Sequence, residues 1–209
     1  MKNVINKLAT SLGRRDDKPN QELAKEIAVS HDRDAVTELI ALLKTSKDKR
    51  IQSDCLKTLY EIGYVQPELI APHIPVFVDL LNSKNNRLVW GAMIALDTIS
   101  QVRPKEIFAH LPTILEATDK GSVITKDHGI GILIHLSAVP EFENTAFDLL
   151  MEQLRKCAAK QLPLYAERCL PVIHEKNKER FLSLLKARLH ELPRESQKKR
   201  IEKVMRTLA

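Results

Sequence analysis

The chain repeats itself at intervals of 37 residues, and this period constrains the fold more than any other feature. Three sets of small or apolar residues recur in one register over four copies: Cys55, Ala92, Gly129 and Ala166; Leu59, Leu96, Leu133 and Leu170; Ile62, Ile99, Leu136 and Ile173. A period of this length is typical of two-helix units that stack in a row, because no unit can bury its apolar face alone. The sequence therefore predicts an all-α protein, a right-handed α-solenoid of about five helical hairpins.

Residues 86–100 show the pattern within one copy. Their apolar positions recur at helical spacing, whereas Asn86, Arg87 and Asp97 fall on the opposite face. A repeated position that is always Cys, Ala or Gly lets two helix backbones approach, while larger neighbours fill the grooves beside it. We expect this helix to be buried between the hairpins before and after it.

Two segments carry a resemblance to a known family. IQSDCLKTLYEIG (51–63) and LVWGAMIALDTIS (88–100), each followed by a second helix that begins with proline, resemble HEAT repeats, whose first helix is similar to V-R-x-x-A-A-x-A-L-x-x-I-G. The resemblance covers about residues 20–190 and implies a stack of hairpins, but the repeat serves many unrelated functions. The chain departs from the family at the position of its arginine, which is occupied by Gln52, Val89 and Lys126.

The predicted organisation is a single domain over residues 1–209. Residues 1–18 form an N-terminal cap, residues 19–192 the repeats, and residues 193–209 a C-terminal capping helix that begins at Pro193. The second helices of two hairpins contain internal prolines such as Pro72 and Pro75, which remove backbone donors. We expect the helix at residues 67–82, which holds Pro72 and Pro75, to have a kinked or broken first turn.

Composition limits the class of protein further. Aromatic residues make up 4% of the chain and hydrophobic residues 44%, so the core must consist mainly of aliphatic side chains. Cys55, Cys157 and Cys169 have no CxxC spacing, and we expect reduced thiols. No window approaches 18 apolar residues and the first residues lack an apolar run, which predicts no membrane contact and a cytoplasmic location.

The net charge of +6 lies entirely at the carboxyl end. Residues 175–209 hold eleven Lys and Arg against five Glu. Such a cluster can bind a phosphate backbone or an acidic protein, or it can be a solvated surface whose own Glu residues pair with it. The candidate binding residues in this basic end are Lys186, Arg188, Lys198, Lys199, Arg200 and Lys203.

His73 and His110 are a second candidate binding feature, because they lie 37 residues apart at one repeat position. In HEAT-like stacks the second helices line the concave surface, so we expect the two side chains to form part of a polar row there. Neighbouring hairpins are about 10 Å apart, which is too far for two imidazoles to share one metal ion.

Two enzyme families with HEAT-like folds provide alternatives. His174-Glu175 and His190-Glu191 are similar to the His-Glu pairs that hold iron in deoxyhypusine hydroxylases, but they are only two and lie 16 residues apart. The alkylpurine DNA glycosylases resemble this chain in size and charge, but their site uses several Trp, and Trp90 is alone here and is interpreted as a packing residue. No phosphate loop, nucleophile elbow or HExxH motif is present.

The sequence therefore predicts a protein that is not an enzyme and has no cofactor or metal. Its expected function is that of a scaffold for protein–protein interaction, through the concave face and the basic end, with an acidic surface on the partner as a natural match. A nucleic-acid-binding protein, related to the glycosylases, stays open as the alternative, and a HEAT-like metal enzyme is the third hypothesis.

Overall fold

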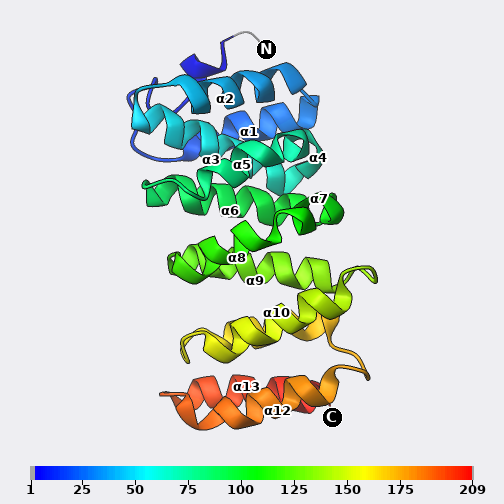
Figure 1. Cartoon of the computed structure of the whole chain (residues 1–209). Helices are drawn as coiled ribbons and strands as arrows, with labels where there is room; N and C mark the ends of the chain where they lie inside the picture. The colour runs from blue at the N-terminus through cyan, green and yellow to red at the C-terminus, as the bar shows by residue number, and fades with distance from the viewer. Residues whose placement is uncertain (1–2, 209) are drawn as a thin grey trace. The chain divides into compact units, whose positions relative to one another are not determined.

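The computed structural model describes residues 3–208, and in this range every regular element is a helix. The chain divides into two compact units, Met1–Gly129 (unit 1) and Ile130–Ala209 (unit 2), with the boundary inside helix α9 (Figure 1). The predicted all-α class is confirmed. Each unit is built from helices whose apolar stripes face one another.

Unit 1 contains most of the helices. They are η1 (Val4–Lys7), α1 (Lys18–Ser30), α2 (Arg33–Thr45), α3 (Lys49–Val65), α4 (Pro67–Ile70), η2 (Ala71–His73), α5 (Ile74–Leu80), α6 (Asn86–Ser100), α7 (Pro104–Ala109), α8 (Leu111–Lys120) and the beginning of α9 (Val123–Ser137). Helix α3 packs against α1, α2 and α6, and α6 also packs against α5. Helices α3 and α6 therefore lie at the centre of unit 1, where they pack against each other and against the helices of neighbouring hairpins.

The repeated small residues lie where the 37-residue period predicts. Cys55, Ala92 and Gly129 are buried, as are the leucine and isoleucine positions that follow the first two of them in α3 and α6. The approach of these helices is close: a Cβ atom on Gly91 would lie 2.6 Å from Cδ2 of Leu56. Small side chains between large ones therefore allow α3 and α6 to pack tightly.

The second helices of the hairpins are broken, as their prolines predict. One is divided into α4, η2 and α5, and the next into α7 and α8. Each break precedes a proline at the second position of the new helix, Pro75 or Pro112, where the missing amide costs nothing. Within the N-terminal cap expected at residues 1–18, Val4–Lys7 forms a 3-10 helix, and Gly13 turns the chain with φ +68°.

Unit 2 holds the remainder of α9 with α10 (Glu143–Lys156), α11 (Leu162–Cys169), η3 (Leu170–Val172), α12 (Lys178–Arg188), η4 (Leu189–Glu191) and α13 (Glu195–Leu208). The capping helix expected to start at Pro193 begins two residues later, at Glu195. The fourth copy of the period also deviates: Ala166 is buried, but Leu170 and Ile173 are partly exposed. The reason is that α11 ends at Cys169, and Pro171 cannot continue it.

Two further expectations concern the whole described range. The three cysteines are free thiols, with Cys55 and Cys169 buried and Cys157 partly exposed. Among residues 3–208, no helix combines the length and the apolar character that crossing a membrane would require. The cytoplasmic location stays a prediction.

Candidate binding groove

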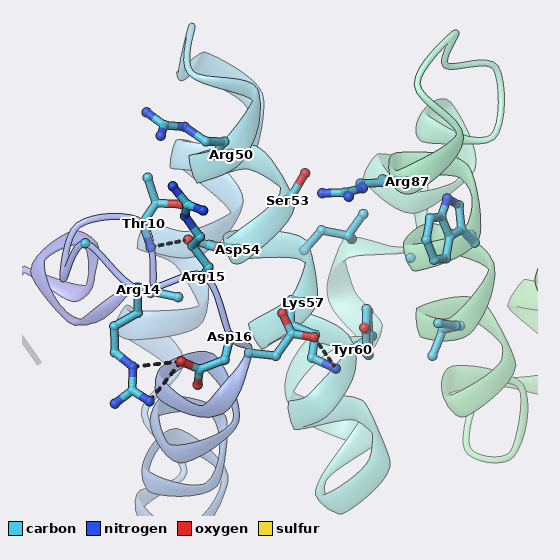
Figure 2. Close-up of a pocket in the computed structure, with 17 residues that line it drawn as sticks. Thr10, Arg14, Arg15, Asp16, Arg50, Ser53, Asp54, Lys57, Tyr60 and Arg87 are labelled. Carbon is cyan, nitrogen blue, oxygen red and sulfur yellow. Dashed lines mark hydrogen bonds and ion pairs between the residues drawn. The ribbon is translucent and has the colours of Figure 1, made fainter.

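An open groove of about 760 Å³ lies in unit 1, between the segment 9–17 and helices α3 and α6 (Figure 2). We call it the N-terminal groove. Its lining residues are Ala9, Thr10, Gly13, Arg14, Arg15, Asp16, Asp17, Arg50, Ser53, Asp54, Leu56, Lys57, Tyr60, Arg87, Trp90, Gly91 and Ile94. Nearly half of them are charged, which sets this groove apart from an apolar ligand pocket.

Asp54 on α3 holds the first wall of the groove in place. Its Oδ2 accepts a hydrogen bond of 2.7 Å from the Thr10 amide, and its Oδ1 accepts one of 2.9 Å from Nδ2 of Asn20. Oδ1 of the buried Asn20 in turn accepts from the Ala9 amide at 2.9 Å. Bonds to a carboxylate are stronger than neutral ones, so this network fixes the segment 9–17 along α3.

The groove has more cations than anions. Arg14, Arg15, Arg50, Lys57 and Arg87 face three aspartates. The Arg14 guanidinium donates to Asp16 at 2.9 Å and holds the pKa of that carboxyl below its usual value. Arg15 and Arg87 form no ion pair with any residue in the described part of the chain. The groove therefore presents two guanidinium groups whose donors are available to a ligand.

Lys57 is the most enclosed of these cations, with 16% of its side chain exposed. Its Nζ lies 2.7 Å from Glu61, 3.5 Å from Asp17 and 4.9 Å from the centre of the Tyr60 ring. Burial is the largest single influence and by itself lowers the pKa of Lys57, but the contacts with Glu61 and Tyr60 together outweigh it, and the pKa lies above its ordinary value. Lys57 therefore stays charged beside an aromatic ring.

Trp90 also lines the groove. The indole is partly exposed, and its Nε1 atom is buried with no hydrogen-bond acceptor among residues 3–208. A buried donor without an acceptor costs about 1–3 kcal/mol, so this is an unusual position for a residue that only packs. Trp90 is the only tryptophan of the chain and gives the groove its own spectroscopic reporter.

The structure places His73 and His110 outside this groove. They occupy equivalent positions, directly before α5 and α8, where the second helices are broken. Both are partly buried, and burial lowers the pKa of His73. Their role in binding stays a prediction. Within the described range, no group of three or more His, Cys, Asp or Glu side chains could hold a metal ion.

The basic end in unit 2 is less uniform than its sequence suggests. Lys186, Lys199 and Lys203 are exposed, but Arg188 is only 8% exposed and its Nη1 donates to the Leu154 carbonyl at 2.7 Å. Arg188 is thus a correction to the predicted set, because its guanidinium is buried in the fold. The two remaining candidates are paired: Arg200 binds both oxygens of Glu167, and Lys198 lies 3.8 Å from Glu195.

Sequence reasoning missed the N-terminal groove. It lies between a non-repeating segment and two repeat helices, so no periodic pattern contains all of its residues. One signal was available, because Arg50 and Arg87 lie 37 residues apart at an exposed position of the repeat. Trp90, interpreted from sequence as a packing residue, proves to line the groove.

No family model matches the chain, and no curated protein matches it. Solved structures of similar fold do exist. A designed armadillo repeat protein matches with a TM-score of 0.60 at 13% identity, covering 92% of this chain and 93% of the other. Computationally designed armadillo repeat proteins for modular peptide recognition match with a TM-score of 0.62 at 14% identity, over 94% and 93% of the two chains. An engineered protein matches with a TM-score of 0.57 at 19% identity, covering 99% of this chain and 96% of the other.

These matches define the class of protein. The chain has the armadillo/HEAT-like repeat fold, an all-α solenoid, as the 37-residue period predicts. At these identities the likeness concerns the fold alone, since one fold supports many functions. The function must therefore be argued from the groove.

Proposed function

We propose that this protein is a non-catalytic scaffold that binds a segment of another protein in the N-terminal groove. The observation that carries the proposal is the pair of guanidinium groups, on Arg15 and Arg87, that have no partner in residues 3–208 and line the groove together with Trp90. Arginine and tryptophan are the residue types that contribute most to protein–protein binding energy.

The groove suits a polypeptide better than a small molecule. Sites for small molecules of similar volume are mostly apolar with a few polar groups, whereas here nearly half of the lining residues are charged. A chain segment lying in an open groove can form several charged and backbone contacts along its length. The likeness to repeat proteins designed for modular peptide recognition supports this reading at the level of the fold.

Catalysis receives no support from the groove. Its acids are engaged in holding the structure: Asp54 binds the segment 9–17, Asp16 binds Arg14 and Asp17 lies beside Lys57. The groove contains no histidine or cysteine that could act as base or nucleophile. We therefore keep the role of a scaffold rather than that of an enzyme.

The basic end provides a second surface in the proposal. Its exposed cations, Lys186, Lys199 and Lys203, would add electrostatic attraction for an acidic partner. The same charges would attract a nucleic acid, so this alternative is tested together with the proposal. Binding to nucleic acid through these lysines would weaken steeply with salt.

Site-specific photo-crosslinking tests the function directly. A photoreactive residue replaces Ser53, which lies in the groove, and in a matched control it replaces Val29, which is 71% exposed on α1. We expect a defined protein to be captured from lysate by the Ser53 variant and not by the Val29 variant. Identical capture by both variants, or capture by Ser53 only of nucleic acid, would contradict the proposal.

A further inference from the structure

We infer that the segment bound in the N-terminal groove is acidic and extended, with two carboxylates three residues apart that bind Arg50 and Arg87. This inference rests on the proposed function and adds the chemistry of the partner. Figure 2 shows the two arginines on neighbouring helices, with Ser53 between them.

The two arginines occupy equivalent positions in consecutive repeats. Each is the second residue of its helix, and each backbone amide donates to the side chain of the capping residue, Asp48 for Arg50 and Asn85 for Arg87. The local backbone is therefore the same at both sites. A ligand that runs from α3 to α6 meets one guanidinium per repeat.

The capping residues differ in charge, and this difference leaves Arg87 available. Asp48 also accepts from the Arg50 guanidinium, with Nη2 and Oδ2 3.0 Å apart, and the pKa of Asp48 is lowered by this contact. Asn85 is neutral and accepts only from the backbone. The Arg50 pair is highly exposed, so it contributes little and exchanges readily for another carboxylate.

The spacing of the helices sets the spacing of the carboxylates. Packed helices lie about 8–10 Å apart, and the close contact of Gly91 with Leu56 places α3 and α6 in this range. An extended polyproline II segment has three residues per turn and rises about 3.1 Å per residue, so residues i and i+3 lie on one side about 9 Å apart. Two acidic residues at this spacing match the separation of the two helices from which Arg50 and Arg87 extend.

Asp17 shows that the groove already holds a carboxylate of this kind. It lies 3.5 Å from Lys57 and is itself 64% exposed. An acidic side chain of a partner could take its place at Lys57 without removing the contact to Glu61. Removing the charge of Asp17 should therefore strengthen the binding of an acidic segment.

A protein segment fits this arrangement better than a nucleic acid. The aspartates of the groove, Asp16, Asp17 and Asp54, would repel a backbone that carries a phosphate at every nucleotide. A polypeptide can place its carboxylates at the arginines and leave uncharged residues beside the aspartates. The groove thus selects for separated rather than continuous negative charge.

Trp90 fluorescence of the full chain tests the inference, because peptides without tryptophan contribute no indole emission. The probes are two synthetic proline-rich peptides of equal length and charge, one with glutamates at i and i+3 and one with glutamates at i and i+1. We expect the first to bind about tenfold more tightly. Arg87→Gln should weaken it about tenfold, whereas Lys105→Gln, which removes an equal charge from an exposed position on α7 outside the groove, should leave it unchanged. Asp17→Asn should tighten it.

The Arg87 side chain is exposed and forms no hydrogen bond or ion pair with the rest of the described chain, so Arg87→Gln should fold normally, and its thermal unfolding checks this. Equal affinity of the two peptides, or no effect of Arg87→Gln, overturns the inference. If a lysine-containing peptide changes Trp90 emission and the acidic peptides do not, the inference fails while the proposed function stands. If an oligothymidine alone changes the emission and Ser53 captures no protein, both fail.

Discussion

Nδ1 of His128 lies 2.6 Å from Oδ2 of Asp97, and this pair ties the start of α9 to α6. Asp97 is 8% exposed, which makes it one of the few buried charged residues of unit 1. From sequence alone both residues look like ordinary polar positions on helix surfaces. In the fold they connect the helices of two successive repeats.

Replacing His128 should therefore destabilise unit 1. His128→Ala removes a hydrogen bond to a buried carboxylate, which should lower the free energy of unfolding by about 1–3 kcal/mol. Lys120→Gln is the control, because it breaks an exposed pair with Glu116 and should cost less than about 0.5 kcal/mol. Urea unfolding followed by circular dichroism measures both, and equal effects of the two substitutions would argue against a structural role for the pair.

A second prediction concerns the close packing of α3 on α6. In Gly91→Ala the new Cβ would lie 2.6 Å from Cδ2 of Leu56, so one of the two helices or the leucine must move. We expect a loss of about 1–3 kcal/mol in the free energy of unfolding. Adding Leu56→Val, which shortens the obstructing side chain, should recover part of that loss. If the two substitutions change the free energy of unfolding additively in a double-mutant cycle, the contact between Leu56 and residue 91 does not cause the loss.

Arg188 and Lys186 provide a matched pair in unit 2. Arg188 donates to the Leu154 carbonyl near the end of α10 and to Glu191, so Arg188→Ala should lower the free energy of unfolding by about 1–3 kcal/mol. Lys186→Ala, two residues away and exposed, should change it by less than about 0.5 kcal/mol. Thermal unfolding separates the two variants. A harmless Arg188→Ala would return this residue to the candidate binding surface.

The buried thiols predict a pH dependence of stability. Burial raises the pKa of Cys55 and of Cys169 to about 12. An unfolded thiol ionises near pH 8.5, so between that pH and about 12 only the unfolded chain releases these protons. Their contribution is fully present below pH 8.5 and is lost as the pH rises, by about 1 kcal/mol per pH unit for each thiol.

Urea unfolding at pH 8 and pH 10 measures this loss. The variant with Cys55→Ala and Cys169→Ala is the control, and its stability should fall less over the same interval. In native protein at pH 8, a chromogenic disulfide should react with Cys157 before the two buried thiols, since Cys157 is partly exposed. Rapid reaction of all three thiols would contradict the burial of Cys55 and Cys169.

Much of the fold could be predicted from the sequence, because the 37-residue period reflects which positions must pack between helices. Cys55, Ala92 and Gly129 recur since each must fit between neighbouring helices, and all three are buried. The pattern weakens at Leu170 and Ile173, where Pro171 ends the helix and a 3-10 turn replaces the buried face. The boundary near Pro193 shifted for a related reason, because a proline fixes its own φ but does not determine where helical hydrogen bonding begins.

The site depends on contacts that no local pattern encodes. Thr10 and Asp54 are 44 residues apart, and only their hydrogen bond places the segment 9–17 along α3. The net charge of the sequence points to the basic end. There, however, Arg188 donates to the Leu154 carbonyl and Arg200 donates to Glu167. The groove has a smaller excess of positive charge, but its cations are arranged around a cavity.

Hydrogen–deuterium exchange of the full chain shows which surface an acidic segment covers. It compares exchange without ligand and with the peptide that carries glutamates at i and i+3. Binding in the N-terminal groove predicts slower exchange in residues 9–17 and in the first turns of α3 and α6, with no change in α12 and α13. Slower exchange confined to α12 and α13 would contradict it, because binding would then belong to the basic end.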